Sequence, residues 1–450
     1  MTVRYLERAR IVASPGWSRW LVPPAALSIQ LAIGQAYAWS VFKKPLETSL
    51  GISGVASALP FTLGIVMLGL SAALFGTVVE RNGPRWAMFV SMCCFCGGFL
   101  LSALGVSVGQ YWLVVLGYGL LGGIGLGIGY ISPVSTLIRW FPDRPGLATG
   151  IAIMGFGGGA LIAAPWSSSM LSAFGATGTH PDPGGIAKTF LILGAGYAVF
   201  MSLGWLLIRV PTRDWQPAAR PVGRLISAGN VTARNAIRTP QFWLLWVVLC
   251  FNVTAGIGIL ERAAPIYTDF FPRDSGLTGL TAAAAGFVAI LSLANMLGRL
   301  GWSATSDALG RKSIYRLYLG AGALLYLVLT LTANANKVVF LVCCMLILSF
   351  YGAGFATVPA YLRDLFGTDQ VGAIHGRLLT AWSVAGALGP VIVNAIADHQ
   401  IAAGVTGPGR YTLSFSIMIG LLVIGFVCNE LIHPVNPTFH EPVAGKAATA

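Results

Sequence analysis

The chain is predicted to be an all-α membrane protein with twelve transmembrane helices arranged in two six-helix halves. Hydrophobic residues make up 56% of its 450 residues and charged residues only 10%, with a mean hydropathy of +0.75. A soluble protein of this size would need more polar surface, because its exterior must face water. The apolar residues also fall into twelve windows that are each long enough to cross a bilayer as a helix.

The twelve windows are separated by glycine, proline or charged residues. The first six lie at about 20–42, 57–79, 85–107, 111–137, 145–171 and 188–210. The second six lie at about 241–262, 280–305, 313–333, 337–361, 374–397 and 411–432. The longest polar stretch separates the two sets. We therefore expect an N-terminal half at 1–210, a cytoplasmic linker at 211–240, a C-terminal half at 241–432 and a cytoplasmic tail at 433–450.

The basic residues predict how the chain crosses the membrane. Twenty of the 28 lysines and arginines lie on the side that carries both termini, and seven lie on the other side. Because basic residues accumulate on the cytoplasmic side of membrane proteins, both termini are expected in the cytoplasm. The chain is thus predicted to be a multi-pass protein of the inner, or cytoplasmic, cell membrane, with the lipid bilayer as its surroundings.

The composition also excludes several kinds of function. The formal net charge of +13 does not indicate a nucleic-acid partner, because the basic residues lie between apolar segments instead of forming a patch. The seven cysteines lie inside apolar runs, and the five histidines are scattered. We therefore expect no metal, no cofactor and no enzymatic activity. His375 and Arg377 are interpreted as interfacial residues, with a part in gating as the alternative.

Arg299 is the charged residue that lies deepest in an apolar window. Such a residue is costly in lipid, so it normally faces an aqueous cavity or a paired group. Asp307, eight residues further on, marks the nearby membrane surface. At about 1.5 Å of rise per residue, Arg299 lies about 12 Å inside that surface, near the middle of a core about 30 Å thick. A fixed positive charge at this depth predicts an anion site; a structural arginine that binds backbone carbonyls is the alternative.

Two loops carry the same pattern at matching places in the two halves. Glu80-Arg-Asn-Gly-Pro-Arg85 follows the second window, and Asp307-Ala-Leu-Gly-Arg-Lys312 follows the eighth. An acid at a helix end, followed by a glycine turn and basic residues, can lock neighbouring helices through charge and helix-end interactions. We expect a conformational latch formed by Glu80, Arg81, Gly83, Arg85, Asp307, Gly310 and Arg311.

These loops resemble the loop 2–3 signature of the major facilitator superfamily, G-x-x-x-D-R/K-x-G-R/K-R/K, and the resemblance covers the whole chain. Three positions depart from it, because Glu80 replaces an aspartate, Pro84 interrupts a basic pair and Ser303 replaces a glycine. The resemblance implies the fold of that family, in which two pseudo-repeats rock about a central site to give alternating access.

Further stretches resemble the oxalate:formate antiporter family, which is related to the monocarboxylate transporters. The most specific are the runs RWFPDRPG at 139–146 and TPQFW at 239–243. The resemblance implies that Arg299 contacts a substrate carboxylate. It also implies aromatic residues along the site, at Tyr37, Tyr130 and Tyr351. Packing is the alternative role of each of these tyrosines.

One position departs from the oxalate-transporting prototype of that family. Alignment through Gly389 places Trp382 where the prototype has a lysine, and no lysine or arginine occurs at 378–396. A dianion would then meet one fixed cation instead of two, and an uncompensated charge in a site of low dielectric constant is costly. A monocarboxylate is therefore expected to fit better than oxalate.

Asn295 is a second informative position. Proton-coupled carriers of the related family have an acid one helical turn before the corresponding arginine, and Asn295 lies there on the face of Arg299. An amide can donate a hydrogen bond to a carboxylate but cannot carry a proton. We therefore expect exchange that needs no proton gradient.

The predicted function is secondary active transport of small organic anions by alternating access. Monocarboxylates such as formate, lactate or pyruvate are the expected substrates and partners, and the expected unit is a functional monomer that works as an exchanger. The predicted binding residues are Arg299, Asn295, Tyr37, Tyr130, Tyr351 and Trp382. Oxalate:formate antiport and proton-coupled monocarboxylate symport are the alternatives, and a transporter-like carboxylate sensor is the alternative from another class.

Overall fold

The computed structural model describes residues 6–14, 16–176, 181–212, 215, 229–272, 277–332 and 336–441. Parts of the predicted linker (213–214 and 216–228) and of the predicted tail (442–450) therefore lie outside the described residues. The described chain is helical, and its β-structure consists of two isolated bridges. The predicted all-α fold class is confirmed.

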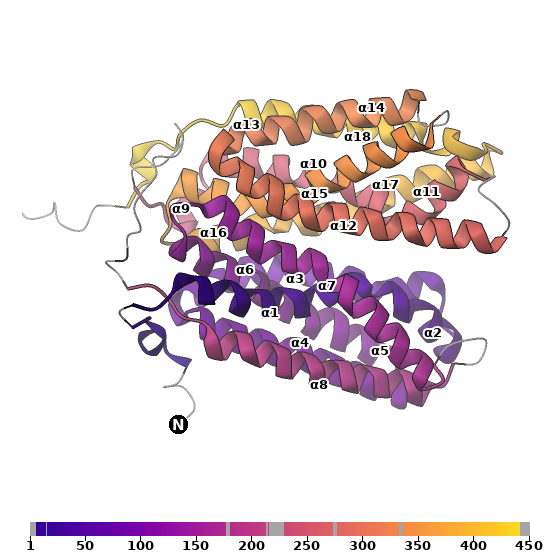
Figure 1. Cartoon of the computed structure of the whole chain (residues 1–450), viewed down its shortest axis with the longest axis horizontal. Helices are drawn as coiled ribbons and strands as arrows, with labels where there is room; N and C mark the ends of the chain where they lie inside the picture. Colours follow the sequence, from indigo (N-terminus) through magenta and orange to yellow (C-terminus); the bar gives the residue numbers. More distant parts are fainter. Residues whose placement is uncertain are drawn as a thin grey trace, which may run out of the picture.

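The helices of the first half lie side by side in the lower part of Figure 1, coloured from indigo to magenta. They are α1 (Val22–Ile33), α2 (Ser40–Leu50), α3 (Gly54–Asn82), α4 (Pro84–Ser107), α5 (Tyr111–Val114), α6 (Gly123–Trp140), α7 (Pro145–Ala173) and α8 (Pro183–Leu207). The π-helical segment η5 (Val115–Gly122) joins α5 to α6.

The helices of the second half lie mostly above them, coloured from pink to yellow (Figure 1). They are α10 (Pro240–Glu261), α11 (Ala263–Phe270), α12 (Leu277–Leu309), α13 (Arg311–Arg316), α14 (Gly322–Thr332), α15 (Lys337–Phe366), α16 (Val371–Leu378), α17 (Thr380–Ala402) and α18 (Thr412–Glu430). The π-helical segment η6 (Leu317–Ala321) joins α13 to α14, and the short α9 (Ala233–Ala236) precedes α10.

Eleven helical segments of the described chain are long and apolar enough to span a membrane. The first predicted span differs from them, because the 3-10 segment η4 (Gly34–Ala38) divides it into α1 and α2. Many large apolar side chains point outward from the spans, and the most exposed are Leu74, Val199 and Leu331. Apolar surface of this extent is expected where a protein faces lipid.

The turns that follow α3 and α12 have closely similar geometry. Gly83 has φ 89° and ψ 171°, and Gly310 has φ 83° and ψ 151°. Both backbones lie in the region of positive φ that favours glycine, so each glycine allows the chain to reverse directly into the next helix. The repeated sequence pattern therefore corresponds to a repeated local structure.

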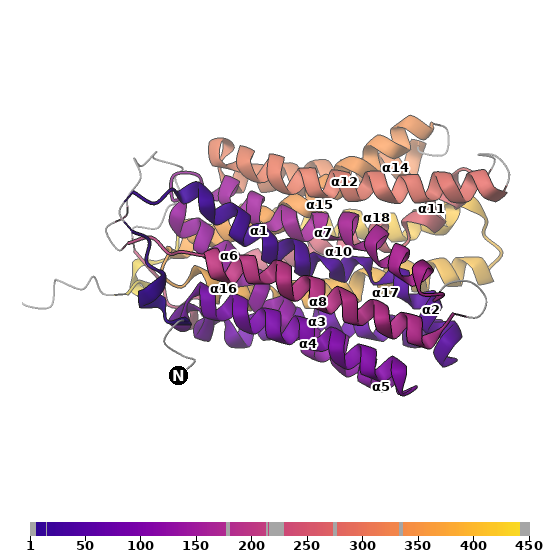
Figure 2. The same cartoon turned by 60° about the horizontal axis from the view of Figure 1, so that its bottom comes forward.

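The two halves meet along two seams, which we define by their helices. In one seam α7 packs against α12, and in the other α3 packs against α16 and α17. Both views place α7 beside α12 (Figures 1 and 2). Small residues allow close approach, since a Cβ on Gly150 of α7 would lie 2.9 Å from the carbonyl oxygen of Arg299.

We call the end of the bundle where the chain enters the first span and leaves the twelfth the linker end. Two backbone pairings close it. The chain before α1 pairs with the chain after α8, through a hydrogen bond of 2.9 Å from Ala13 N to Val210 O. The chain before α10 pairs with the chain after α18, through a bridge between Val231 and His440.

Candidate functional site

Arg299 lies in α12 with its side chain fully buried. Its Nε donates a hydrogen bond to Asn295 Oδ1 at 3.1 Å, one helical turn earlier. Its Nη1 donates to the carbonyl oxygen of Ile153 in α7 at 3.1 Å, across the boundary between the two halves. Its Nη2 has no hydrogen-bond partner among the described residues. The guanidinium is therefore fixed on two sides and free on the third.

Glycines provide the space that this side chain occupies. A Cβ on Gly157 of α7 would lie 3.0 Å from Arg299 Nε, and a Cβ on Gly352 of α15 would lie 3.0 Å from Arg299 Cγ. The same Cβ on Gly352 would collide with the Oδ1 atom of Asn295. A larger residue at either position would displace the guanidinium, so both glycines help to position the charge.

Aromatic rings surround the guanidinium. Its Cζ lies 5.9 Å from the centroid of Phe156 and 5.6 Å from that of Phe355, within the range of cation–π attraction. Trp382 closes the group, since its ring centroid lies 5.5 Å from Phe156, 4.4 Å from Phe355 and 5.5 Å from Tyr130. The charge thus lies in an aromatic setting, where electrostatic interactions are stronger than in water.

Several hydrogen-bond donors in this region are buried and have no partner among the described residues. They are the hydroxyl of Tyr130 and the indole Nε1 of Trp382, together with the hydroxyls of Tyr37 and Tyr351, which lie against each other without good hydrogen-bond geometry. Buried polar groups are nearly always hydrogen-bonded, so a cluster of unpaired ones calls for an explanation. Together with Arg299 Nη2 they form a set that can donate to an anion. We call Arg299, Tyr37, Tyr130, Tyr351 and Trp382 the donor group.

The structure brings the residues of the predicted site into one region. Tyr37 lies edge-to-face on Phe156 at 5.0 Å, and Tyr130 lies on the same ring at 5.4 Å. The hydroxyl of Tyr351 lies within electrostatic range of Tyr37, Tyr130 and Arg299. Asn295 is engaged with Arg299 through its oxygen. This contact points to a role in positioning the arginine, whereas the sequence suggested a direct contact with substrate.

The sequence did not single out Phe156, Phe355, Gly157 or Ile153 as site residues. Phe355 ends the run Tyr351-Gly-Ala-Gly-Phe355, whose two ends face the same site. Small residues such as Gly157 allow close helix packing, and here the group that packs against the glycine is a charged side chain. The sequence could not predict the contact with the backbone carbonyl of Ile153, because every residue type has a backbone carbonyl.

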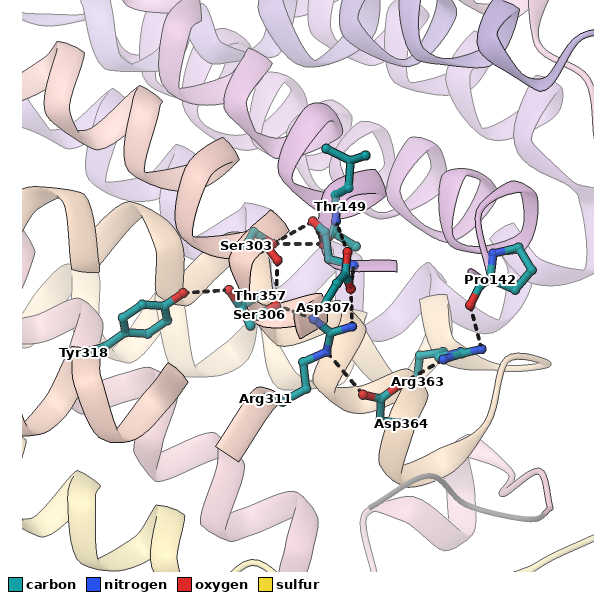
Figure 3. A network of polar contacts seen from close by, with 12 residues as sticks. Pro142, Thr149, Ser303, Ser306, Asp307, Arg311, Tyr318, Thr357, Arg363 and Asp364 are labelled. Atoms are coloured by element: carbon teal, nitrogen blue, oxygen red, sulfur yellow. Dashed lines mark hydrogen bonds and ion pairs between the residues drawn. The ribbon is translucent and has the colours of Figure 1, made fainter. Parts of the chain in front are cut away.

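At the linker end, Asp307 joins the two halves (Figure 3). Its carboxylate accepts hydrogen bonds from the backbone N–H groups of Gly146 and Leu147, at 2.8 and 2.9 Å, in the first turn of α7. The unpaired N–H groups and the positive end of the helix dipole favour a carboxylate there. Arg311 bonds the same carboxylate at 2.6 Å and reaches Asp364 at 3.2 Å.

Glu80 makes the corresponding contact from the first half. Its Oε1 accepts a hydrogen bond of 3.0 Å from Gly372 N in the first turn of α16, and its other oxygen pairs with Arg139. Arg139 also donates to the carbonyl oxygen of Asp369, at 3.1 Å. In the same way, Arg363 of the second half donates to the carbonyl oxygen of Pro142, at 3.2 Å (Figure 3). Each half therefore holds the start of a helix in the other half.

The remaining residues of the predicted latch behave differently from one another. Arg85 is buried and donates to the carbonyl oxygens of Trp205 and Leu206 at the end of α8, so it joins two helices of the same half. Arg81 is exposed and pairs with none of the described residues. The sequence had not assigned Arg139 and Arg363 to the latch, although each lies in the last turn of its span, six spans apart.

Comparison with known proteins gives the family and the relatives of this chain. A family model described as Major Facilitator Superfamily matches residues 25–390. The chain is 27% identical over 389 residues to the oxalate:formate antiporter of Oxalobacter formigenes, covering 85% of this chain and 86% of that protein. It is 26% identical over 400 residues to the apicoplast pyruvate carrier 1 of Toxoplasma gondii, covering 77% of this chain and 70% of that protein.

Solved structures show the same fold. The chain matches the transporter FucP in its outward conformation with a TM-score of 0.67 at 13% identity, over 92% of this chain and 98% of that one. It also matches a bacterial homologue of ferroportin in an outward-facing state, with a TM-score of 0.66 at 14% identity, over 91% and 98%. The helical architecture and the family match together show that this chain belongs to the Major Facilitator Superfamily.

Proposed function

We propose that the protein is a secondary transporter of small monocarboxylates and that Arg299 binds the carboxylate. The observation that carries this proposal is a fully buried guanidinium with one free nitrogen and no ion pair among the described residues. The unpaired donors of Tyr130 and Trp382 lie near it, as do the adjacent hydroxyls of Tyr37 and Tyr351. An uncompensated buried charge destabilises a protein by several kcal/mol. A bound anion would supply the missing charge and would accept the free hydrogen bonds.

The charge balance of the site favours a monoanion. A single carboxylate neutralises Arg299, whereas a dianion would leave one negative charge among the rings of Phe156, Phe355 and Trp382. The names of two relatives refer to small carboxylates, which are pyruvate in one case and both formate and the dianion oxalate in the other. Formate, lactate and pyruvate are therefore the first substrates to test, with oxalate as the competing candidate.

Alternation follows from the arrangement of the two halves. The contacts of Asp307 and Glu80 with helices of the opposite half close the linker end, and these contacts must break before the site can open there. The positive charge at this end supports a cytoplasmic location for both termini, in the inner membrane. We propose the monomer as the functional unit, with every member of the donor group supplied by the same chain.

The coupling that best fits the site is exchange of one anion for another. Asn295 is bonded to Arg299 and cannot carry a proton. Among the described residues, no acid forms an ion pair with Arg299. An empty site would keep its positive charge uncompensated, and a loaded site would be neutral. The return step should therefore be faster when a second anion is bound.

Counterflow in proteoliposomes tests the proposal. We expect purified protein to exchange at least one labelled monocarboxylate, and we expect Arg299→Gln to reduce the rate at least about 100-fold, as expected when a charged hydrogen bond is lost from a buried site. Lys188→Gln is the matched control, because it removes an exposed positive charge from α8.

Normal exchange by a well-folded Arg299→Gln protein would contradict the assignment of the site. Binding of a carboxylate by the wild type without any exchange would instead indicate a sensor. Rapid exchange of oxalate together with poor exchange of every monocarboxylate would support the assignment as a transporter but would contradict the proposed substrate class.

A further inference from the structure

His375 is a buried polar side chain that the proposed site does not yet use. It lies in α16, is 1% exposed, and neither Nδ1 nor Nε2 has a hydrogen-bond partner among the described residues. An imidazole always carries at least one N–H donor, and its second nitrogen is either a donor or an acceptor. A side chain with both nitrogens buried and unpaired is uncommon. In this conformation His375 therefore makes none of the hydrogen bonds that its two ring nitrogens could form with described residues.

His375 lies next to the donor group, on its linker-end side. Its ring centroid lies 5.8 Å from that of Tyr130, which also contacts Trp382 and Phe156. Trp382 follows seven residues later in the chain, which corresponds to about 10 Å of helical rise. His375 is thus separated from the surroundings of Arg299 by one layer of aromatic rings.

The charged groups near His375 are already engaged. Glu80 of α3 is bonded to Arg139 of α6 and to Gly372 N. Arg377, two residues beyond His375, donates to Ala373 O at 3.2 Å and to Thr77 at 3.4 Å. On α15, Asp364 is paired with Arg311 and Arg363. Unlike these charged groups, the imidazole of His375 has no hydrogen-bond partner among the described residues.

The contact between His375 and Tyr130 joins the two halves, since α16 belongs to the second half and α6 to the first. Close packing holds it in place, because a Cβ on the neighbouring Gly376 would collide with the carbonyl oxygen of Ala72 in α3. Separation of the halves at the linker end would part the two rings. It would then expose the imidazole N–H on the route that leads away from Arg299.

We propose that His375 is a second anion-binding residue, which the carboxylate contacts as it passes between Arg299 and the linker end. The proposal rests on the proposed function, because it assumes that a carboxylate binds at Arg299. It predicts that anions entering from the two ends of the bundle bind with different contacts. In the conformation described here the aromatic layer covers His375, so an anion that enters from the opposite end binds without it. An anion that enters from the linker end meets His375 first.

Exchange measured separately from each face of the membrane tests this asymmetry. Membrane vesicles of both orientations are loaded with whichever of formate, lactate or pyruvate the wild type exchanges fastest. We expect His375→Phe, which keeps the ring but removes both nitrogens, to raise the KM from the linker end about five- to tenfold, through loss of one hydrogen bond to a charged group. The KM from the opposite end should stay within about twofold.

Two further variants separate binding from packing. His375→Gln, whose amide can donate a hydrogen bond, should recover most of the affinity at the linker end. His399→Phe is the matched control, because His399 is exposed near the far end of α17. An equal change of KM on both faces, or no change on either, would overturn the proposal. Arg299→Gln tests the proposed function independently, since it should abolish exchange from both faces.

A measurement on the wild type keeps the proposal testable if the variants fold poorly. Diethyl pyrocarbonate modifies accessible imidazoles, and peptide mapping by mass spectrometry identifies the histidine that reacted. We expect His375 to react when the reagent is applied from the linker end and to be protected by the transported carboxylate. Modification of His375 that the carboxylate does not reduce would count against a binding role.

Discussion

At the scale of single residues, the site is defined by atoms that the fold leaves unbonded. The depth of Arg299 in its window was enough to predict a buried charge. The sequence could not show which nitrogen of the guanidinium stays free, because one of its partners is the carbonyl of Ile153, 146 residues away. Periodicity within one helix carries no information about a backbone atom in the other half.

We expect Trp382 to be the residue that distinguishes this candidate site from one with two cations. We expect Trp382→Lys to shift the preference towards oxalate by about tenfold or more relative to a monocarboxylate, because it adds a second positive charge beside Arg299. Competition of oxalate and formate against the same labelled substrate measures this ratio. Trp382→Phe is the control, since it removes the indole N–H without adding charge and should not improve oxalate binding.

Asn295 allows a test of proton coupling at one position. Wild-type exchange should proceed at the same rate with and without a pH gradient. In Asn295→Asp, an ionised carboxylate would pair with Arg299 and compete with the substrate, and this pairing lowers the pKa of the introduced acid below its usual value of about 3.9. Substrate binding by this variant should therefore be weak at every pH from about 5 to 8, which binding measurements across that range check. A wild-type rate that depends strictly on a proton gradient would contradict the proposed exchange.

At the scale of elements, the sequence predicted the positions of the spans well but missed a break and an arrangement. The first window is apolar throughout and contains no proline after residue 24. Its sequence therefore did not predict the break in the helix at η4 (Gly34–Ala38). The two glycine loops were predicted to form a repeated latch, and their turns have similar geometry. Their acids pair with neighbouring helices of the same half, as expected, and they also bind helix starts of the opposite half. The sequence did not predict this second set of contacts, because pairing between halves depends on tertiary packing.

The contacts that Asp307 makes between the halves predict a separation between binding and turnover. Asp307→Asn keeps an oxygen that can accept from α7 but loses the charge that faces Arg311 and the helix terminus. Because Asp307 lies about 12 Å from Arg299 along α12, we expect the exchange rate to fall several-fold while the affinity for the carboxylate changes by less than about twofold. Affinity and exchange are measured on one preparation, and a loss confined to affinity would count against the latch.

At the scale of the whole molecule, the two halves face one site and are closed against each other at one end. The sequence predicted the two-half organisation from the spacing of its windows and the repeated loops. It could not predict which end is closed. One sequence encodes every conformation of the transport cycle, and a pattern of residues does not show which conformation has the lowest free energy. The contacts of Arg139 and Arg363 across the boundary belong to this particular conformation.

The two backbone pairings at the linker end have a consequence for how the chain can be assembled. Val210 is tied to the chain before α1, and His440 is tied to the chain before α10, so each half fastens its own beginning to its own end. We therefore predict that assembly does not need the covalent connection between them. We expect two separately translated polypeptides, divided between residues 216 and 228, to associate in the membrane and to restore exchange. Co-purification through a tag on one fragment, followed by counterflow, measures this, and fragments that fail to associate would show that the halves need their tether.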